Sequence, residues 1–214
     1  VSGGLWSITN IENASSEWTK VSDFWDTLNI TSVATDPTDA NIIYIGTGEK
    51  RGMGLKGFGV WKTSDGGSTW NQLSSSTGFK WIDTIIVRDE GGVGAVYVGG
   101  GRSLSEGEYT GINGLQKSTD GGATWTEVLG EIAAGSSHHV TDLEIDSNNR
   151  LIVGTRTNTF NEGGGQVFYS DDGSTFTQFN LGALGSFDRT FVDVSPSDPN
   201  ILYVMMENGS TGYI

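Results

Sequence analysis

Apolar and polar residues alternate along this chain in short runs that predict β-strands. Residues 42–46, 95–99 and 151–154 are rich in β-branched and aromatic side chains, and Gly, Pro, Asn or Asp bounds each run. Such runs are typical of strands separated by tight turns. No segment shows the apolar stripe of period 3.6 that an amphipathic helix needs. The pattern therefore predicts an essentially all-β protein.

The strand pattern repeats along the chain. Three segments align without gaps at spacings of 55 and 51 residues, namely residues 59–70, 114–125 and 165–176. A degenerate fourth copy occupies residues 5–21. Each of these segments reads as two strands, which we call C and D, joined by a turn. A second pair of strands, A and B, recurs with the same period at residues 30–46, 82–99, 140–154 and 191–204.

Four strands in each period of about 52 residues predict a β-propeller built of four-stranded antiparallel blades. We expect a single propeller region over 1–214, with repeats at about 1–29 (partial), 30–81, 82–139, 140–189 and 190–214 (partial). The first C–D pair and the last A–B pair either close a four-bladed ring or belong to a larger propeller of six to eight blades. We favour the second interpretation, in which the chain is about four blades' worth of a longer protein.

The turn between strands C and D reads Ser/Thr-x-Asp-Gly-Gly-x-Thr-Trp. Its aspartate can accept hydrogen bonds from the backbone N–H groups just ahead, and its glycines supply the positive φ that the turn needs. The motif resembles the Asp-box, or BNR repeat, of sialidases, xyloglucanases, sortilin and a photosystem assembly factor. In that family the boxes are structural and lie opposite the ligand site. The resemblance implies this structural role for Ser64, Asp65, Gly67, Thr69, Trp70, Thr119, Asp120, Gly122, Thr124, Trp125, Ser170, Asp171, Gly173, Thr175 and Phe176.

The sequence around the turns is similar to that of large secreted propeller proteins exported by bacteria with a type IX secretion system. Residues 1–6, 30–44 and 46–49 carry this resemblance. It implies a secreted or cell-surface bacterial protein.

The composition and net charge exclude several classes of binding partner. The formal charge is −14, with 33 Gly and no Cys among 214 residues. An acidic field does not attract nucleic acid or an anionic membrane surface, and no apolar run is long enough to insert into a membrane. Without cysteine there is no thiolate metal site. We expect no cofactor and no metal.

The B–C and D–A connections fall on the propeller face opposite the C–D turns, which we call the loop face. They are long and mix aromatic rings with arginines and carboxylates, which suits a sugar or a peptide terminus. The alternative interpretation is that the tryptophans fill gaps between blades and the charges only solvate the loops. The ligand-binding candidates are Trp25, Glu49, Arg51, Trp81, Arg102, Tyr109, Arg156 and Arg189.

Two catalytic templates can be tested on this face. A sialidase needs three arginines, a Tyr–Glu pair and an acid, and a xyloglucanase needs two carboxyl groups facing each other across a cleft. The carboxylates available for either are Glu49, Glu106, Glu108 and Asp188, and no local motif supports a particular pair. We therefore expect a binding or adhesion module for a glycan or a protein, with a glycoside hydrolase of sialidase or xyloglucanase type as the alternative.

Overall fold

The computed structural model describes residues 3–21, 29–48, 56–105, 108–182, 187–208 and 211–212. The described segments are β-strands and turns, with one short 3-10 turn, η1 (Ser74–Ser76). Blade 1 consists of β3 (Ile30–Asp36), β4 (Asp39–Thr47), β5 (Val60–Thr63) and β6 (Asn71–Gln72). Blade 2 consists of β7 (Ile82–Asp89), β8 (Gly94–Gly100), β11 (Leu115–Ser118) and β12 (Thr126–Glu127).

Blade 3 consists of β13 (His139–Ile145), β14 (Leu151–Arg156), β15 (Val167–Ser170) and β16 (Thr177–Gln178). A fourth unit contains β17 (Arg189–Val194), β18 (Leu202–Asn208) and β19 (Thr211–Gly212). Two hairpins complete the described structure, β1 (Trp6–Ser7) with β2 (Thr19–Lys20), and β9 (Arg102–Ser105) with β10 (Glu108–Gly111). All strand pairs are antiparallel. The predicted fold class, all-β with four-stranded antiparallel blades, is confirmed.

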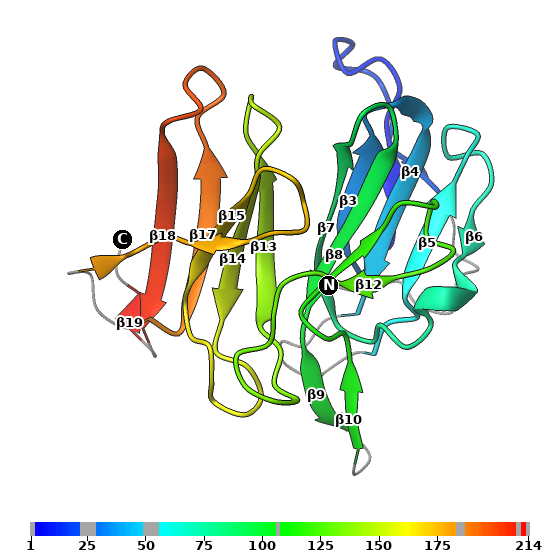
Figure 1. Ribbon diagram of the computed structural model, residues 1–214. Coiled ribbons are helices and arrows are strands. Elements are labelled where there is room, and N and C mark those ends of the chain that lie inside the picture. Colours follow the sequence, from blue (N-terminus) through cyan, green and yellow to red (C-terminus); the bar gives the residue numbers. More distant parts are fainter. Residues whose placement is uncertain are drawn as a thin grey trace.

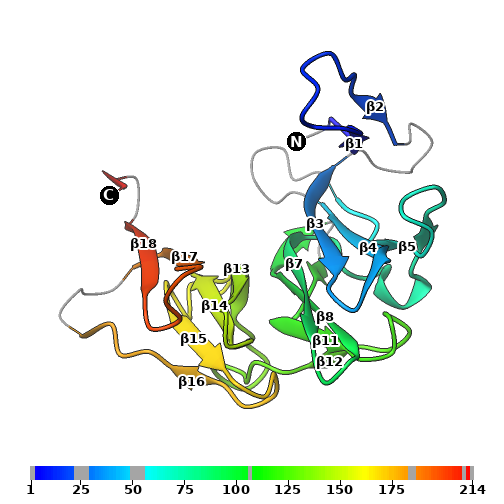
Figure 2. The same cartoon turned by 90° about the horizontal axis from the view of Figure 1, so that it is seen from above.

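The blades stand side by side on an open arc (Figure 2), with the A strands β3, β7, β13 and β17 on its concave side. The β1–β2 hairpin lies at one end of the arc and β18 at the other. Within the described ranges no strand of β1–β2 pairs with β17 or β18. The closed four-bladed ring, which requires that pairing, is not the arrangement that the structure adopts.

Successive blades approach each other at glycines in the B strands. A Cβ atom added to Gly46 would lie 2.5 Å from Cγ2 of Ile82, the first residue of β7. A Cβ added to Gly99 would lie 2.5 Å from Cγ1 of Val140 in β13. A Cβ added to Gly154 would lie 3.0 Å from the carbonyl oxygen of Thr190 in β17, the first strand of the fourth unit, which we call blade 4. The first two junctions therefore need a residue without a side chain at this position, and the third is tight there as well.

Apolar side chains fill the junctions around these contacts. One cluster joins blades 1 and 2 and includes the fully buried Tyr44, Val60 and Ile82. A second cluster joins blades 2 and 3 and includes Tyr97 and Leu151. The core of this protein is thus divided among the blade junctions, because each blade is one sheet thick and buries its faces on its neighbours.

The C–D turns are closed by an aspartate and a hydroxyl group. In blade 1, Asp65 accepts hydrogen bonds from the backbone N–H and the hydroxyl of Thr69 at 2.8 and 2.7 Å. The hydroxyl of Thr63 donates to Asp65 at 2.7 Å and accepts the N–H of Gly67 at 3.0 Å. The corresponding bonds recur around Asp120 in blade 2.

In the third turn, the prediction from the gapless alignment is wrong about which aspartate closes the turn. Asp172, not Asp171, accepts the N–H of Thr175 at 2.7 Å and the hydroxyl of Ser170 at 3.1 Å. Asp171 instead accepts a hydrogen bond from Arg150 at 2.7 Å. The reason is that this turn is one residue shorter than the other two, so the gapless alignment misplaces its aspartate by one position.

The hydroxyl groups in the first two turns also need a correction. They belong to Thr63 and Ser118, and not to the predicted Ser64 and Thr119, which lie one residue further along. Consecutive side chains of an extended segment point to opposite sides, so a shift of one residue removes the hydroxyl from the turn.

A lysine of the preceding blade reaches each of the two later turns. The ammonium group of Lys62 donates to the carbonyl of Gly121 at 3.3 Å, and that of Lys117 donates to the carbonyl of Gly173 at 3.4 Å. Lys117 also pairs with Glu90 at 2.7 Å. The turns therefore serve as contacts between blades as well as chain reversals.

We predict that Gly99→Ala destabilises the fold because the added methyl group meets the β-branched side chains of Val140 and Thr84. Overpacking of this kind costs about 1–3 kcal/mol, which in a domain of this size lowers the melting temperature by roughly 2–4 °C per kcal/mol. Thermal unfolding followed by circular dichroism measures the change. Gly130→Ala is the matched control, because no atom lies within 4 Å of its added Cβ; equal melting temperatures for the two variants would contradict the prediction.

We also predict an acid-dependent contribution from the turns. Hydrogen bonds from the hydroxyl and the N–H of Thr69, and then from Thr63, lower the pKa of Asp65 from 3.8 to about 2. Because the pKa is lower in the folded chain, this carboxylate stabilises the fold above about pH 4 and loses that effect as the pH falls toward 2.

The melting temperature of Asp65→Asn should therefore lie below that of the native chain at pH 6, and the gap should narrow at pH 2. Asp171→Asn is the control, since Asp171 makes no turn hydrogen bond of this kind. A gap for Asp65→Asn that is the same at both pH values would refute this account.

Candidate functional site

The loop face carries two projecting connections at the junction of blades 2 and 3. The β9–β10 hairpin extends from blade 2 at the bottom of Figure 1, and the 157–166 connection of blade 3 lies beside it. The hydroxyl of Thr159 donates to the carbonyl of Arg102 and joins the two connections. The B–C connections of adjacent blades thus form one continuous surface.

The A strands of the three complete blades each carry a β-bulge near the loop face. The bulged residues are Thr31 in β3, Asp83 in β7 and Thr141 in β13. The hydroxyl of Thr31 donates to the carbonyl of Ile82 at 2.6 Å, and that of Thr141 donates to the carbonyl of Thr190 at 3.3 Å. In blades 1 and 3 the bulge therefore directs a hydroxyl group onto the backbone of the next blade.

Blade 2 departs from this pattern. The bulged residue here is Asp83, and its Oδ2 lies 2.6 Å from Nε2 of His139, the first residue of β13. The imidazole is 1% exposed, whereas the aspartate side chain is 25% exposed. A buried imidazole thus lies behind a carboxyl group that solvent reaches, and a bulge next to a site commonly re-aims a side chain in this way.

The second histidine is buried beside the first. His138 packs edge-on against Phe168 with ring centroids 5.0 Å apart, and no hydrogen-bond partner of its Nδ1 lies within the described ranges. Burial lowers the pKa of His138 from 6.5 to about 4, so the ring is neutral at pH 7. His138 and His139 line one small cavity together with Arg102 and Phe160.

The structure places the predicted loop-face residues in different environments. Trp81 is 3% exposed and packs against Gly111 of the β9–β10 hairpin, so its ring is buried within blade 2 and is not available to stack on a ligand. Arg102 lines the cavity beside the histidines. Arg156 and Arg189 lie opposite each other where β14 pairs with β17, and the guanidinium of Arg189 covers the ring of Phe191 at 4.0 Å.

The four predicted carboxylates are only partly described. Asp188 lies at the junction of blades 3 and 4, where its side chain accepts the hydroxyl of Thr157 at 3.5 Å. Glu108 and Tyr109 belong to strand β10, but their side chains are outside the described part. Trp25, Glu49, Arg51 and Glu106 lie outside the described residues altogether. Their roles stay predictions.

Asp83 and His139 were missed as site residues from the sequence. Aligning the A strands on one another places Asp83 where Thr31 and Thr141 stand, and that single change of residue type was the available signal. His139 begins strand β13 and is buried.

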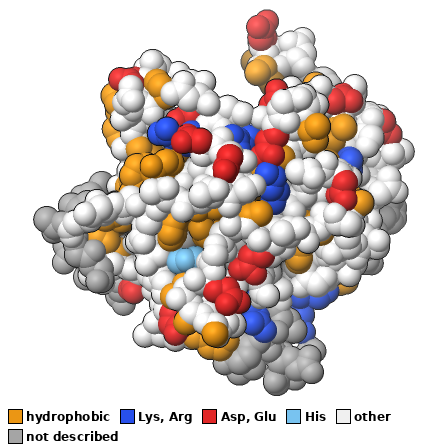
Figure 3. Space-filling view, in the orientation of Figure 1, with side chains coloured by type: hydrophobic (Ala, Val, Ile, Leu, Met, Phe, Trp, Pro, Cys, Tyr) orange, Lys and Arg blue, Asp and Glu red, His pale blue; other side chains and the backbone are white. Residues whose placement is uncertain are grey.

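The surface chemistry around the site is mixed. Figure 3 shows acidic and basic side chains interspersed over the visible face, with apolar side chains among them. Within the described ranges, no group of three or more His, Asp or Glu could hold a metal ion. No helix in the described part is long and apolar enough to cross a membrane.

The chain is similar in sequence to curated xyloglucanases. It is 31% identical over 129 residues to a xyloglucanase from Paenibacillus sp, a match that covers 50% of this chain and 11% of the relative. It is 34% identical over 119 residues to the xyloglucanase Xgh74A of Acetivibrio thermocellus, covering 50% of this chain and 13% of that protein. The chain therefore matches only a small part of the length of these relatives. No protein-family model matches it.

Solved structures support the fold. The GH74 enzyme of Niastella koreensis is 21% identical, with a TM-score of 0.55, over 97% of this chain and 38% of that one. An ancestral GH74 enzyme is 20% identical, with a TM-score of 0.59, over 91% of this chain and 25% of that one. These likenesses establish a β-propeller fold.

We predict that His138 stays neutral well below pH 6. Since burial lowers its pKa to about 4, the unfolded chain takes up a proton near pH 6.5 before the folded chain does, and the stability of the fold should decline between pH 6.5 and 4. Proton NMR of the imidazole C–H signals measures the titration. His138→Gln identifies the signal by its loss and should flatten the decline, and a midpoint near 6.5 for that signal would contradict the prediction.

Proposed function

We propose that this chain is part of a glycan-degrading propeller enzyme of the xyloglucanase kind, that its loop face binds a β-glucan chain, and that Asp83 supplies one of the reacting carboxyl groups. The observation that carries the proposal is the Asp83–His139 pair, which replaces the threonine–carbonyl contact of the neighbouring bulges on the loop face. The names of the relatives supply the substrate class.

The chemistry of glycoside hydrolysis uses two carboxyl groups on opposite sides of the scissile bond. Nε2 of His139 lies 2.6 Å from Oδ2 of Asp83 and holds the carboxyl group in place. As a carboxylate, Asp83 can accept a proton from water or attack the sugar directly. The second carboxyl group belongs to the set Glu49, Glu106, Glu108 and Asp188, in which the pairing stays a prediction.

Similarity to xyloglucanases favours the hydrolase alternative over the binding or adhesion module that the sequence alone suggested. Binding without hydrolysis is the competing outcome of the test below. A polymeric glucan does not enter cells, so we place the protein outside the cell or on its surface. Export by a type IX system is an expectation from resemblance only.

The test is hydrolysis of xyloglucan by the native chain and by Asp83 variants, followed as release of reducing ends. Asp83→Asn is expected to lower kcat by on the order of 100-fold or more, the usual contribution of a general acid or base. Asp83→Thr should lose the same activity while keeping the melting temperature, because threonine stands at this bulge in blades 1 and 3.

Thr141→Ser is the matched control, since it changes the equivalent bulge in blade 3 and keeps its hydroxyl group. It should retain activity. Binding of xyloglucan by the native chain without any turnover would overturn the hydrolase proposal and support a binding module. Full activity in Asp83→Thr would remove Asp83 from the reaction.

A further inference from the structure

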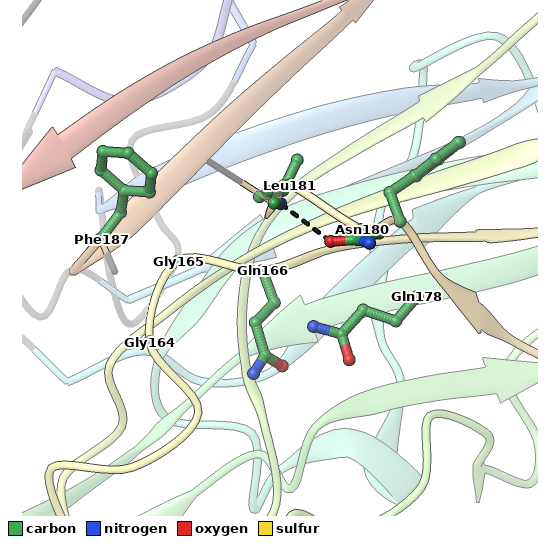
Figure 4. Close-up of a pocket in the computed structure, with 9 residues that line it drawn as sticks. Gly164, Gly165, Gln166, Gln178, Asn180, Leu181 and Phe187 are labelled. Atoms are coloured by element: carbon green, nitrogen blue, oxygen red, sulfur yellow. Dashed lines mark hydrogen bonds between the residues drawn. The ribbon is translucent and has the colours of Figure 1, made fainter. Parts of the chain in front are cut away.

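A second cavity, of about 480 Å³, opens at the rim of blade 3 (Figure 4) and shares no residue with the Asp83–His139 pair or the small cavity beside it. It lies where the B–C connection enters β15 and the chain leaves β16. Its side chains come from Gln166, Gln178, Phe179, Asn180, Leu181 and Phe187. The volume is in the range of small-ligand sites, about 300–1,000 Å³.

The cavity exists because blade 3 departs from its neighbours at the start of strand C. The residue before this strand is Gly59 in blade 1 and Gly114 in blade 2, each with a positive φ and each covered by the D–A connection or strand D. At Gly59, the carbonyl of Ser76 occupies the place of a side chain. Strand pairing puts Gln166 at this position in blade 3, and its side chain extends into the open space instead.

A glutamine in strand D provides a second contrast. In blade 1, Gln72 pairs with Trp61 and its amide donates to the carbonyl of Phe58 at 2.6 Å. In blade 3, the equivalent Gln178 pairs with Phe168, but its amide makes no hydrogen bond within the described part of the chain, and neither does the side-chain amide of Gln166. Figure 4 shows the amide group of Gln178 directed toward the side chain of Gln166.

The remaining lining groups are neutral as well. Asn180 accepts the N–H of Gly182 at 2.9 Å through its oxygen, which leaves its NH2 group to donate. Phe179 is held by a ring contact with Tyr169, with centroids 4.8 Å apart, and Phe187 lies half-buried on the opposite wall. Among the residues that the structure describes, no charged side chain lines the cavity.

We propose that this cavity is a subsite for one neutral pyranose unit of a glycan. Each amide offers both a donor and an acceptor, as a sugar hydroxyl does, and the phenyl rings can cover the apolar C–H face of the ring. An anionic sugar such as a sialic acid finds no cation in the lining to compensate its charge. The ligand class rests on the proposed function, whereas the place of the subsite rests on the cavity itself.

The experiment measures binding of cellotetraose and of a xyloglucan heptasaccharide by isothermal titration calorimetry. Gln166→Ala combined with Gln178→Ala is expected to raise the Kd about 10-fold, which corresponds to two ordinary hydrogen bonds, with an unchanged melting temperature. Gln72→Ala is the matched control, because it removes the equivalent glutamine of blade 1 and should leave the Kd unchanged. An unchanged Kd in the double variant would overturn the subsite.

The side-chain amide signals of Gln166 and Gln178 in NMR spectra separate this proposal from the proposed function. If the glucan probes shift these signals and the native chain hydrolyses xyloglucan, the subsite and the proposed function are both supported. If β-glucans neither bind nor react but another neutral oligosaccharide shifts these signals, the subsite stands and the proposed function falls. If a panel of neutral oligosaccharides leaves the signals unmoved, the subsite is refuted, whatever the outcome at Asp83.

Discussion

The close approach of one blade to the next governs this structure. A blade is a single small sheet with two faces to bury, and it can bury them only if its inner strands press on those of its neighbours. Gly46 and Gly99 allow this, because a side chain at either position would collide with Ile82 or Val140 of the following blade. The apolar clusters that join blades 1, 2 and 3 surround these contacts. Polar contacts follow the same rule, since Thr31 bonds to the backbone of the next blade across the junction. Stability is therefore built at the junctions, and each junction is repeated with small changes.

The two faces of the arc use this framework differently. On the face of the C–D turns, Asp65 and Asp120 close nearly identical loops, and lysines of the preceding blades hold the later turns in place. Such contacts leave little room for variation, which is typical of a structural role. On the loop face the connections differ from blade to blade in length and composition, as the β9–β10 hairpin illustrates. A rigid scaffold with variable loops on one face is the usual arrangement for a binding or catalytic surface.

Because the blades repeat, each position in one blade can be compared with the equivalent position in the others, and a change of residue type stands out. Two departures place polar side chains where the other blades have none of that kind. Asp83 stands where the other bulges have threonine and draws His139 toward it, and Gln166 stands where the other blades have glycine and opens a cavity lined by neutral amides. Neither change improves packing, since one places a carboxylate against a buried imidazole and the other leaves polar groups without protein partners. Both departures lie on the loop face or at its rim, where the connections vary from blade to blade.

The repeat, the strand order and the all-β class were determined by the sequence itself, because turns and alternating apolar residues are local signals that reappear every 51 to 55 residues. The sequence also identified Asp65 and Asp120 as residues of the turns. It misassigned Asp171 for Asp172, since a turn shortened by one residue looks the same in an alignment until the strand register is known. Only the tertiary structure brought Asp83 to His139, 56 residues further along the chain, and Thr31 to the backbone of Ile82. These contacts cross a blade junction, and a junction is made by packing between repeats, about which the local pattern within one repeat carries no information.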